Sequence, residues 1–193
     1  MVALSLVPIV FAIQGPARYK FAFRDLRDHY RLEVRSSSGQ LIWGRRTLNR
    51  AAAWSSDHRS LFFADAPEEL WRYGYRLSYW RNGKRLQKIH LPPLPGGLGE
   101  GIFKNGIKIS PDDQLVLIRV APTEGSFDLD TGWLICVDVA SGRSTLFDGS
   151  SEKFRWLNTH TVEYYDWRNL GTAEDPKLRL SGPFLWTFKP EKQ

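Results

Sequence analysis

The chain has 193 residues, of which 42% are hydrophobic and 25% charged, and its formal net charge is +6. This length supports one well-buried core or at most two small ones, and the composition excludes a chain that is disordered throughout. Lys and Arg outnumber Asp and Glu by 16 to 7 over residues 1–95, whereas the acids lead by 14 to 11 over residues 96–193. Such an asymmetry can mark a surface for an anionic partner. Many of these arginines alternate with apolar residues, however, which favours the interpretation that they line the solvent faces of strands.

Residues 1–13 form the only long apolar stretch, MVALSLVPIVFAI. This stretch is too short to span a bilayer, and Pro8 interrupts it. It also lacks the basic start and the small-residue cleavage site of a signal peptide. We therefore predict a buried or edge strand at 3–12 and a cytoplasmic protein, with an uncleaved or miscalled export signal over residues 1–14 as the alternative.

Alternating or continuous apolar runs predict strands along the rest of the chain. They lie at 19–24, 30–35, 40–45, 50–54, 60–64, 73–80, 85–90, 107–110, 114–120, 133–138, 143–147, 153–157, 161–166, 177–180 and 184–188. Gly-containing turns such as Asn82-Gly83 and Ser141-Gly142 close hairpins between them. Residues 66–71 favour a single helical turn at most, and no longer window has a helical apolar period. The chain is therefore predicted to be all-β.

One short pattern occurs three times, beginning at Trp54, Ile109 and Trp156. Each copy runs from this large apolar residue through a polar turn into an apolar strand, and we expect the three residues to occupy equivalent core positions. A unit of about four strands that recurs every ~45–55 residues is typical of propeller blades. We divide the chain, as a single domain, into four blade-like units at 1–48, 49–96, 97–149 and 150–190.

The segments WSSDHRSLFF from Trp54, ISPDDQLVL from Ile109 and LICVDVASGR from Leu134 resemble blades of TolB-type and WD-repeat propellers. The resemblance covers roughly residues 50–165 and implies a β-propeller, but no particular activity, because that fold hosts enzymes, receptors and scaffolds alike. His58 and Asp113 stand where such blades have Gly, and both tolerate the turn. Four units are fewer than these families usually have. A closed four-bladed ring is the leading arrangement, and an open fragment that closes by association or a β-sandwich are the alternatives.

Candidate catalytic and metal-binding residues are few. The sequence has no nucleophile elbow, phosphate-binding glycine loop, zinc-protease motif or paired cysteines. Cys136 lies in an apolar strand and is predicted to be a small buried residue. His58 and His160 fall at equivalent turn positions, which explains them better than catalysis does. We predict no cofactor, with Ca²⁺ at Asp128 and Asp130 as the alternative, although the acid that would complete such a loop is missing.

Aromatic and basic residues alternate over residues 71–85, and residues 70–99 contain no acid. Two strands joined at Asn82-Gly83 would carry a basic hairpin. It comprises Arg72, Arg76, Arg81, Lys84, Arg85 and Lys88. We predict a non-enzymatic interaction or scaffold module that binds an acidic protein through this hairpin, with self-association as a further option and no membrane partner. The alternatives are an enzyme or enzyme accessory with a cation-dependent site in the propeller opening, and, less favoured, a nucleic-acid-binding protein.

Overall fold

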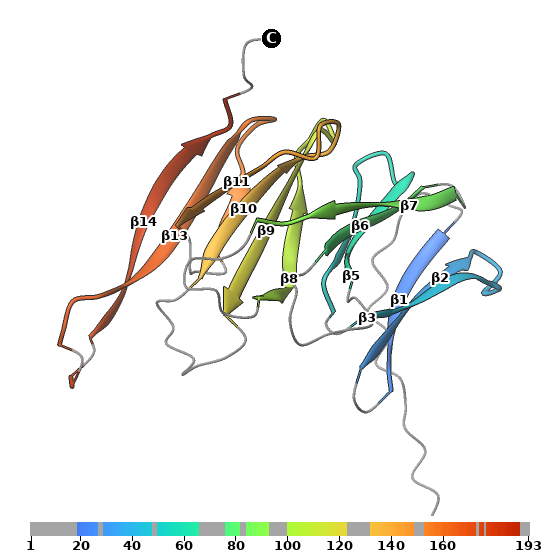
Figure 1. The fold of residues 1–193 in the computed structure, drawn as a ribbon, viewed down its shortest axis with the longest axis horizontal. Helices are drawn as coiled ribbons and strands as arrows, with labels where there is room; N and C mark the ends of the chain where they lie inside the picture. Colours follow the sequence, from blue (N-terminus) through green and yellow to red (C-terminus); the bar gives the residue numbers. More distant parts are fainter. Residues whose placement is uncertain are drawn as a thin grey trace, which may run out of the picture.

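The computed structural model describes residues 19–26, 29–47, 50–65, 76–81, 84–92, 100–122, 132–148, 153–172, 174–175 and 177–189. Every regular element within these residues is a β-strand (Figure 1). None of them forms a helix of the length and apolar character that crossing a bilayer requires. The strands build four antiparallel sheets, and within each sheet the strands follow one another in chain order. The predicted all-β architecture of four units is therefore confirmed.

The four sheets are named A to D in chain order. Sheet A contains β1 (Tyr19–Asp25), β2 (Tyr30–Ser36) and β3 (Leu41–Thr47). Sheet B contains β4 (Ala52–Trp54), β5 (Ser60–Asp65), β6 (Arg76–Arg81) and β7 (Lys84–His90). Sheet C contains β8 (Glu100–Ile109), β9 (Leu115–Pro122), β10 (Trp133–Asp138) and β11 (Ser144–Asp148). Sheet D contains β12 (Phe154–Trp156), β13 (Thr161–Asn169) and β14 (Leu178–Thr187).

The predicted bounds differ most from the structure in two strands. The strand β8 begins at Glu100, well before the expected position 107. The strand β14 is continuous where two strands were expected, because the register shifts opposite Tyr164 and Asp166 and absorbs Gly182 and Pro183 as an irregularity instead of a turn. The predicted strand at 3–12 and the helical turn at 66–71 lie outside the described residues.

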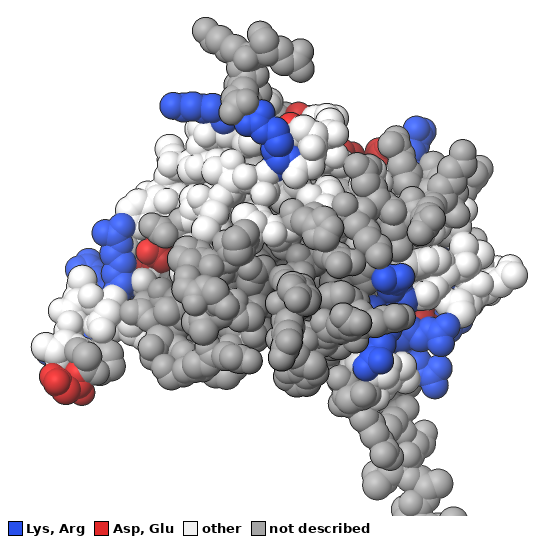
Figure 2. Space-filling view, viewed as in Figure 1, with Lys and Arg blue, Asp and Glu red and all other residues white. Residues whose placement is uncertain are grey.

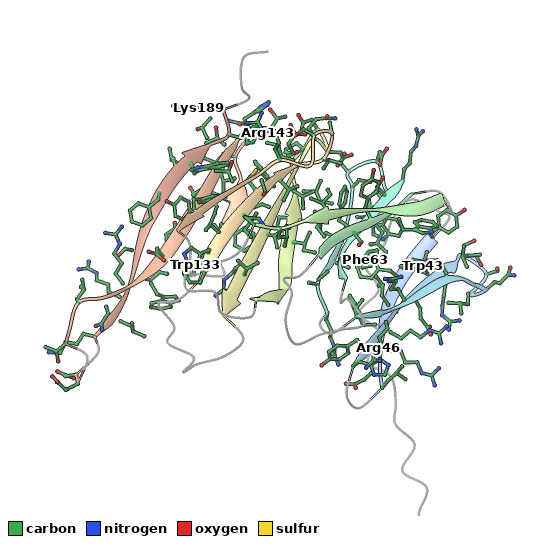
Figure 3. All side chains as sticks on the ribbon, in the orientation of Figure 1. Trp43, Arg46, Phe63, Trp133, Arg143 and Lys189 are labelled. Carbon is green, nitrogen blue, oxygen red and sulfur yellow. The ribbon has the colours of Figure 1, made fainter. Side chains whose placement is uncertain are left out.

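The sheets stack face to face, and three hydrophobic clusters fill the spaces between them. Phe21, Leu32 and Val34 of sheet A meet Trp54 and the other apolar residues of sheet B in the first cluster. In Figure 3, Trp43 of β3 points toward Phe63 of β5 across this space, and their ring centroids are 5.4 Å apart. The second cluster lies between sheets B and C and the third between sheets C and D. Sheets B and C are therefore covered on both faces.

The predicted repeat is structural. Trp54, Ile109 and Trp156 each end the first strand of their sheet, and each belongs to, or packs against, the cluster shared with the preceding sheet. Only Trp54, at 9% exposure, counts as a core residue, because Ile109 and Trp156 are half-buried. The three residues thus occupy the same place in their strands and face the preceding sheet, but they are not equally buried.

The turns that follow Trp54 and Ile109 repeat one hydrogen-bond pattern. The hydroxyls of the buried residues Ser55 and Ser110 each donate a 2.7 Å hydrogen bond to the carboxylate two residues later, Asp57 or Asp112. His58 and Asp113 have φ of 52° and 60°, so the two positions where Gly was expected do adopt the left-handed conformation. Among the described residues His160 is not one with positive φ. His58 and His160 both lie between the first two strands of their sheets, as predicted, but the conformational counterpart of His58 is Asp113.

The four sheets form an open fan. Sheet A lies at the right of Figure 1 and sheet D at the left, and the first strands of sheets B, C and D contact one another in sequence. Among the described residues no hydrophobic cluster joins sheet A to sheet D. The open arrangement is therefore observed, and the closed four-bladed ring, which was the leading arrangement, is not.

Candidate functional site

The basic hairpin predicted from the sequence falls on β6 and β7. These strands pair as expected, with Arg81 opposite Lys84 at the closed end and Arg76 opposite His90 at the far end. Arg85 and Lys88 lie on β7, and Lys88 pairs with Ser78. For all five basic residues on these strands the structure describes only the backbone, and Arg72 lies outside the described residues. Their role in binding stays a prediction.

The candidate cation ligands Asp128 and Asp130 also lie outside the described residues. Within the part of the chain that is described, no group of three or more His, Cys, Asp or Glu side chains is placed to hold a metal ion. A Ca²⁺ site at the two aspartates therefore stays a prediction as well.

A second basic surface, which the sequence analysis did not single out, covers the outward face of sheet A. Its cations are Lys20, Arg24, Arg31, Arg35 and Arg46. The strand register sets Lys20 opposite Arg35, and sets Arg31 between Arg24 and Arg46. Figure 2 shows Lys and Arg side chains gathered at the right-hand end of the molecule, where Figure 1 draws sheet A. We call these five residues the sheet A basic face.

Glu33 is the only acid on this outward face among the described residues of sheet A, and it is buried, with 6% of its surface exposed. Arg35 contacts its carboxylate at 2.7 Å and Arg31 at 3.7 Å. Both arginine side chains stay nearly half exposed, at 44% and 45%. The carboxylate therefore holds two guanidinium groups side by side while both remain open to a partner.

Gly44, which pairs with Glu33 across the strands, provides room for this arrangement. A Cβ atom at Gly44 would lie 3.0 Å from Nε of Arg31. The absent side chain therefore lets the Arg31 guanidinium lie against β3, close to Glu33.

The signal for the sheet A basic face was present in the sequence. Alternation in YRLEVRS, residues 30–36, puts Leu32 and Val34 on one face and Arg31, Glu33 and Arg35 on the other. Arginines in this pattern were predicted only to line the solvent faces of strands. Alternation places each strand's charges on one side, but it does not show that three strands bring them into register, which is what concentrates the charge.

The inner edge of the fan carries a partly buried cation, Lys108 on β8. Its ammonium group donates a hydrogen bond to the carbonyl oxygen of Phe154 and lies 4.2 Å from the centroid of the Phe154 ring. The indole N–H of Trp156 donates to the carbonyl oxygen of Lys108 at 3.2 Å. Burial lowers the pKa of Lys108. These contacts link sheets C and D, so we assign Lys108 to the stacking of the blades.

Cys136 is buried in the cluster between sheets C and D, as predicted. Burial, with a smaller effect from the nearby Asp138 carboxylate, raises the pKa of its thiol to about 12. A thiol in this state is protonated at neutral pH and is a poor nucleophile.

The turn after Trp54 is bonded to the turn after Ile109. The carboxylate of Asp113 accepts hydrogen bonds from the backbone N–H of Ser56 at 2.6 Å and from its hydroxyl at 2.8 Å. Nearby, Nε1 of Trp54 and Nδ1 of His58 are buried without a hydrogen-bond partner, and their rings are 6.4 Å apart. The hydrogen bonds of Asp113 therefore join the turn of sheet B to the turn of sheet C. The two ring nitrogens without a hydrogen-bond partner, on Trp54 and His58, lie on the side of sheet A.

No protein-family model matches the chain, and no curated protein matches its sequence. Solved structures do match. An acylaminoacyl peptidase in complex with Z-Gly-Gly-Phe-chloromethyl ketone gives a TM-score of 0.58 at 8% identity, over 94% of this chain and 31% of its own. The β-propeller domain of the Trilobed protease from Pyrococcus furiosus, which has an open velcro topology, gives 0.52 at 12% identity, over 97% of this chain and 59% of its own. The acylaminoacyl peptidase of Pyrococcus horikoshii gives a TM-score of 0.53 at 8% identity, over 88% of this chain and 29% of its own.

Identities this low show the fold alone, and the fold that they show is that of a β-propeller. The chain spans between 29% and 59% of the length of these three proteins, so it corresponds to part of each. An open propeller segment agrees with both the fan of four sheets and the likeness to the Trilobed protease domain. The finer resemblance to TolB-type or WD-repeat blades stays a prediction.

Proposed function

We propose that the chain is a non-enzymatic interaction module of propeller type, and that the sheet A basic face binds an acidic surface of another protein. The observation that carries the proposal is the register of the five cations, which stand in cross-strand rows around one buried carboxylate. Like charges directly opposite each other destabilise a sheet. A partner that supplies carboxylates would relieve this repulsion and form charge-assisted hydrogen bonds with Arg31 and Arg35.

The charge balance of the chain supports the same proposal. The excess of basic residues lies in the half that contains sheets A and B. The hairpin of β6 and β7 would extend the positive potential from sheet A onto sheet B. Such a field speeds the encounter with an acidic partner, and salt screens it over about 10 Å at 0.1 M ionic strength.

Charge reversal on sheet A tests the proposal. Lys20→Glu with Arg24→Glu changes two exposed residues that leave the contacts of Glu33 intact. Arg168→Glu with Arg179→Glu makes the same change in net charge on an exposed pair of sheet D and serves as the matched control. The probe is a fluorescent poly-glutamate peptide, titrated at low and at physiological salt. We expect the sheet A variant to bind roughly tenfold more weakly and the control to stay within about twofold.

Two further arms separate this proposal from its rivals. If Lys84→Glu with Arg85→Glu removes peptide binding while the sheet A variant keeps it, the predicted hairpin is the site and the sheet A proposal is wrong. If single-stranded DNA of equal charge binds more tightly than the peptide, with a steep dependence on salt, the protein is a nucleic-acid binder instead. Equal losses in the sheet A variant and its control would show that net charge alone drives binding.

A further inference from the structure

The outward face of sheet D differs in kind from the sheet A basic face. Strand register places Glu163 between Arg155 and Leu185 in one cross-strand row, and Trp167 opposite Leu180 in another. Leu178 continues the apolar row toward the end of the long ribbon of β13 and β14, which extends past sheet C in Figure 1.

Contacts on the opposite face confirm this assignment. The guanidinium carbon of Arg168 lies 4.8 Å from the Phe184 ring centroid, and Phe184 in turn contacts Tyr164, which packs against the cluster with sheet C. Arg168 and Tyr164 therefore face sheet C. Because side chains alternate along a strand, Tyr165 and Trp167 face outward.

This outward face carries a row of apolar side chains beside the pair of Arg155 and Glu163. Leu185 is 66% exposed, the largest exposed fraction of any large hydrophobic residue in the described part of the chain. Tyr165, Trp167, Leu178 and Leu180 are only partly buried. Elsewhere in the fan such a face is covered by the next sheet, as the three hydrophobic clusters show. A face exposed to solvent is normally polar, whereas this face of sheet D combines one ion pair with several large apolar side chains.

We propose that the outward face of sheet D packs against the same face of a second copy of the chain, about a twofold axis. Three pairings of the two end sheets can be compared. Sheet A against sheet A would oppose like charges across the whole surface. Sheet A against sheet D would bury arginines on Leu185 and Trp167, which costs desolvation, and Glu163 on that face is already paired with Arg155. Sheet D against sheet D covers apolar side chains with apolar side chains and has neither cost.

The ion pair on this face makes the surface self-complementary. Arg155 contacts Glu163 at 2.8 Å, with 68% of the Arg155 side chain and 17% of the Glu163 side chain exposed. A twofold interface brings each residue of one copy against a residue of the other and the reverse. One surface that holds both a cation and an anion beside an apolar row can therefore satisfy its own charges across the axis, which a surface of one sign cannot.

The test is the oligomeric state of the whole chain, measured by sedimentation and light scattering from about 1 µM to about 200 µM, a range that suits an interface of one sheet face. We expect a reversible dimer, and Leu185→Asp is expected to raise its dissociation constant at least tenfold. Leu41→Asp is the matched control, because Leu41 is also exposed, at 41%, but lies on sheet A. It is expected to leave the dimer unchanged.

A charge-exchange experiment keeps the proposal testable even if Leu185→Asp affects folding. Lys153 also lies on this face, with its ammonium group 6.0 Å from the centroid of the Tyr165 ring. Arg155→Glu and Glu163→Arg each replace the ion pair with two like charges, so each variant alone is expected to be monomeric. An equimolar mixture of the two is expected to dimerise, because opposite charges then meet across the axis. A monomer at every concentration, a dimer lost only in Leu41→Asp, or a mixture that stays monomeric would each overturn the proposal.

Discussion

Sheets A and D stand at opposite ends of the fan, and each packs one face against a four-stranded sheet. Their inward faces are built alike, from aromatic and aliphatic side chains. Their outward faces differ, because sheet A carries five cations around Glu33 whereas sheet D carries Leu185 and a row of partly buried apolar residues. The difference shows that stacking against a neighbouring sheet determines the residues of only one face of an end sheet. The outer face of an end sheet is then available for a separate role.

The same difference can be traced to the strands. In β2 every second residue is apolar and the residues between them are charged or polar, so one face is fully polar. In β13 the aromatic residues Tyr164 and Tyr165 are adjacent, so both faces receive apolar side chains. A strand with this second pattern is typical of a sheet that is covered on both sides. Sheet D is covered on one side by sheet C, which is why its other side is expected to acquire a neighbour.

The largest effect is expected from Trp54→Ala, which tests how sheet A is held. The Trp54 ring lies 6.1 Å from the rings of both Phe21 and Trp80, at the centre of the cluster between sheets A and B. Its loss leaves a cavity and should lower the free energy of unfolding by about 3–5 kcal/mol. Hydrogen exchange should rise in β1–β3 before it rises in β13 and β14.

Trp54→Phe is the control for this change. It keeps most of the buried area and removes an indole N–H that has no partner, so the loss should be only about 1 kcal/mol. A loss below about 1 kcal/mol for Trp54→Ala itself would show that the repeat position is not part of the core.

Phe154→Ala makes the corresponding change at the other end of the fan. Phe154 is 4% exposed in the cluster between sheets C and D, and it also supports the ammonium group of Lys108. The expected loss in unfolding free energy is about 3 kcal/mol. Exchange should now rise first in β12–β14 and leave β1–β3 protected. Equal acceleration along the whole chain would mean that the two ends are not independent.

Glu33→Gln tests the organisation of the sheet A basic face. The substitution removes the charge that holds Arg31 and Arg35, so these two guanidinium groups lose their shared carboxylate. We expect a loss of about 1–2 kcal/mol in unfolding free energy, part of which added salt should restore. Glu163→Gln, in the more exposed pair of sheet D, should cost less than Glu33→Gln does. A loss that is insensitive to salt would point to packing instead of charge.

Much of the fold was predictable because it depends on local chemistry. The turns at Ser55 and Ser110, the left-handed residues His58 and Asp113 and most of the described strands follow from short sequence patterns. The failures have a different cause. The continuity of β14 depends on pairing with β13, and the open fan depends on which faces find a neighbour. Both are non-local properties that a pattern of short period does not contain.

The candidate site was harder to predict for the same reason. A run of basic residues at 71–85 is conspicuous in the sequence, and its side chains stay untested. Lys20, Arg31 and Arg46 belong to three separate strands, and no window of the sequence shows them together. Only the register of sheet A makes them one surface. The charge density of such a surface can therefore be judged only once the strand register is known.

The smallest effect expected is a change in labelling at Cys136, which distinguishes the opening of one end from that of the other. Cys136 is buried between sheets C and D, and the raised pKa of its thiol keeps it unreactive in the folded state. A thiol reagent at neutral pH should therefore label it faster in Phe154→Ala than in Trp54→Ala when the two variants have equal stability. The thiol also contributes to alkaline sensitivity, because its pKa is 9.0 in the unfolded reference and about 12 in the fold. The contribution of this thiol to the free energy of unfolding is therefore fully present below pH 9. It falls as pH rises toward 12, because only the unfolded chain releases the thiol proton in that range. Cys136→Ala should remove this contribution to the pH dependence. In the labelling experiment, equal rates in Phe154→Ala and Trp54→Ala would show that sheets A and D open together.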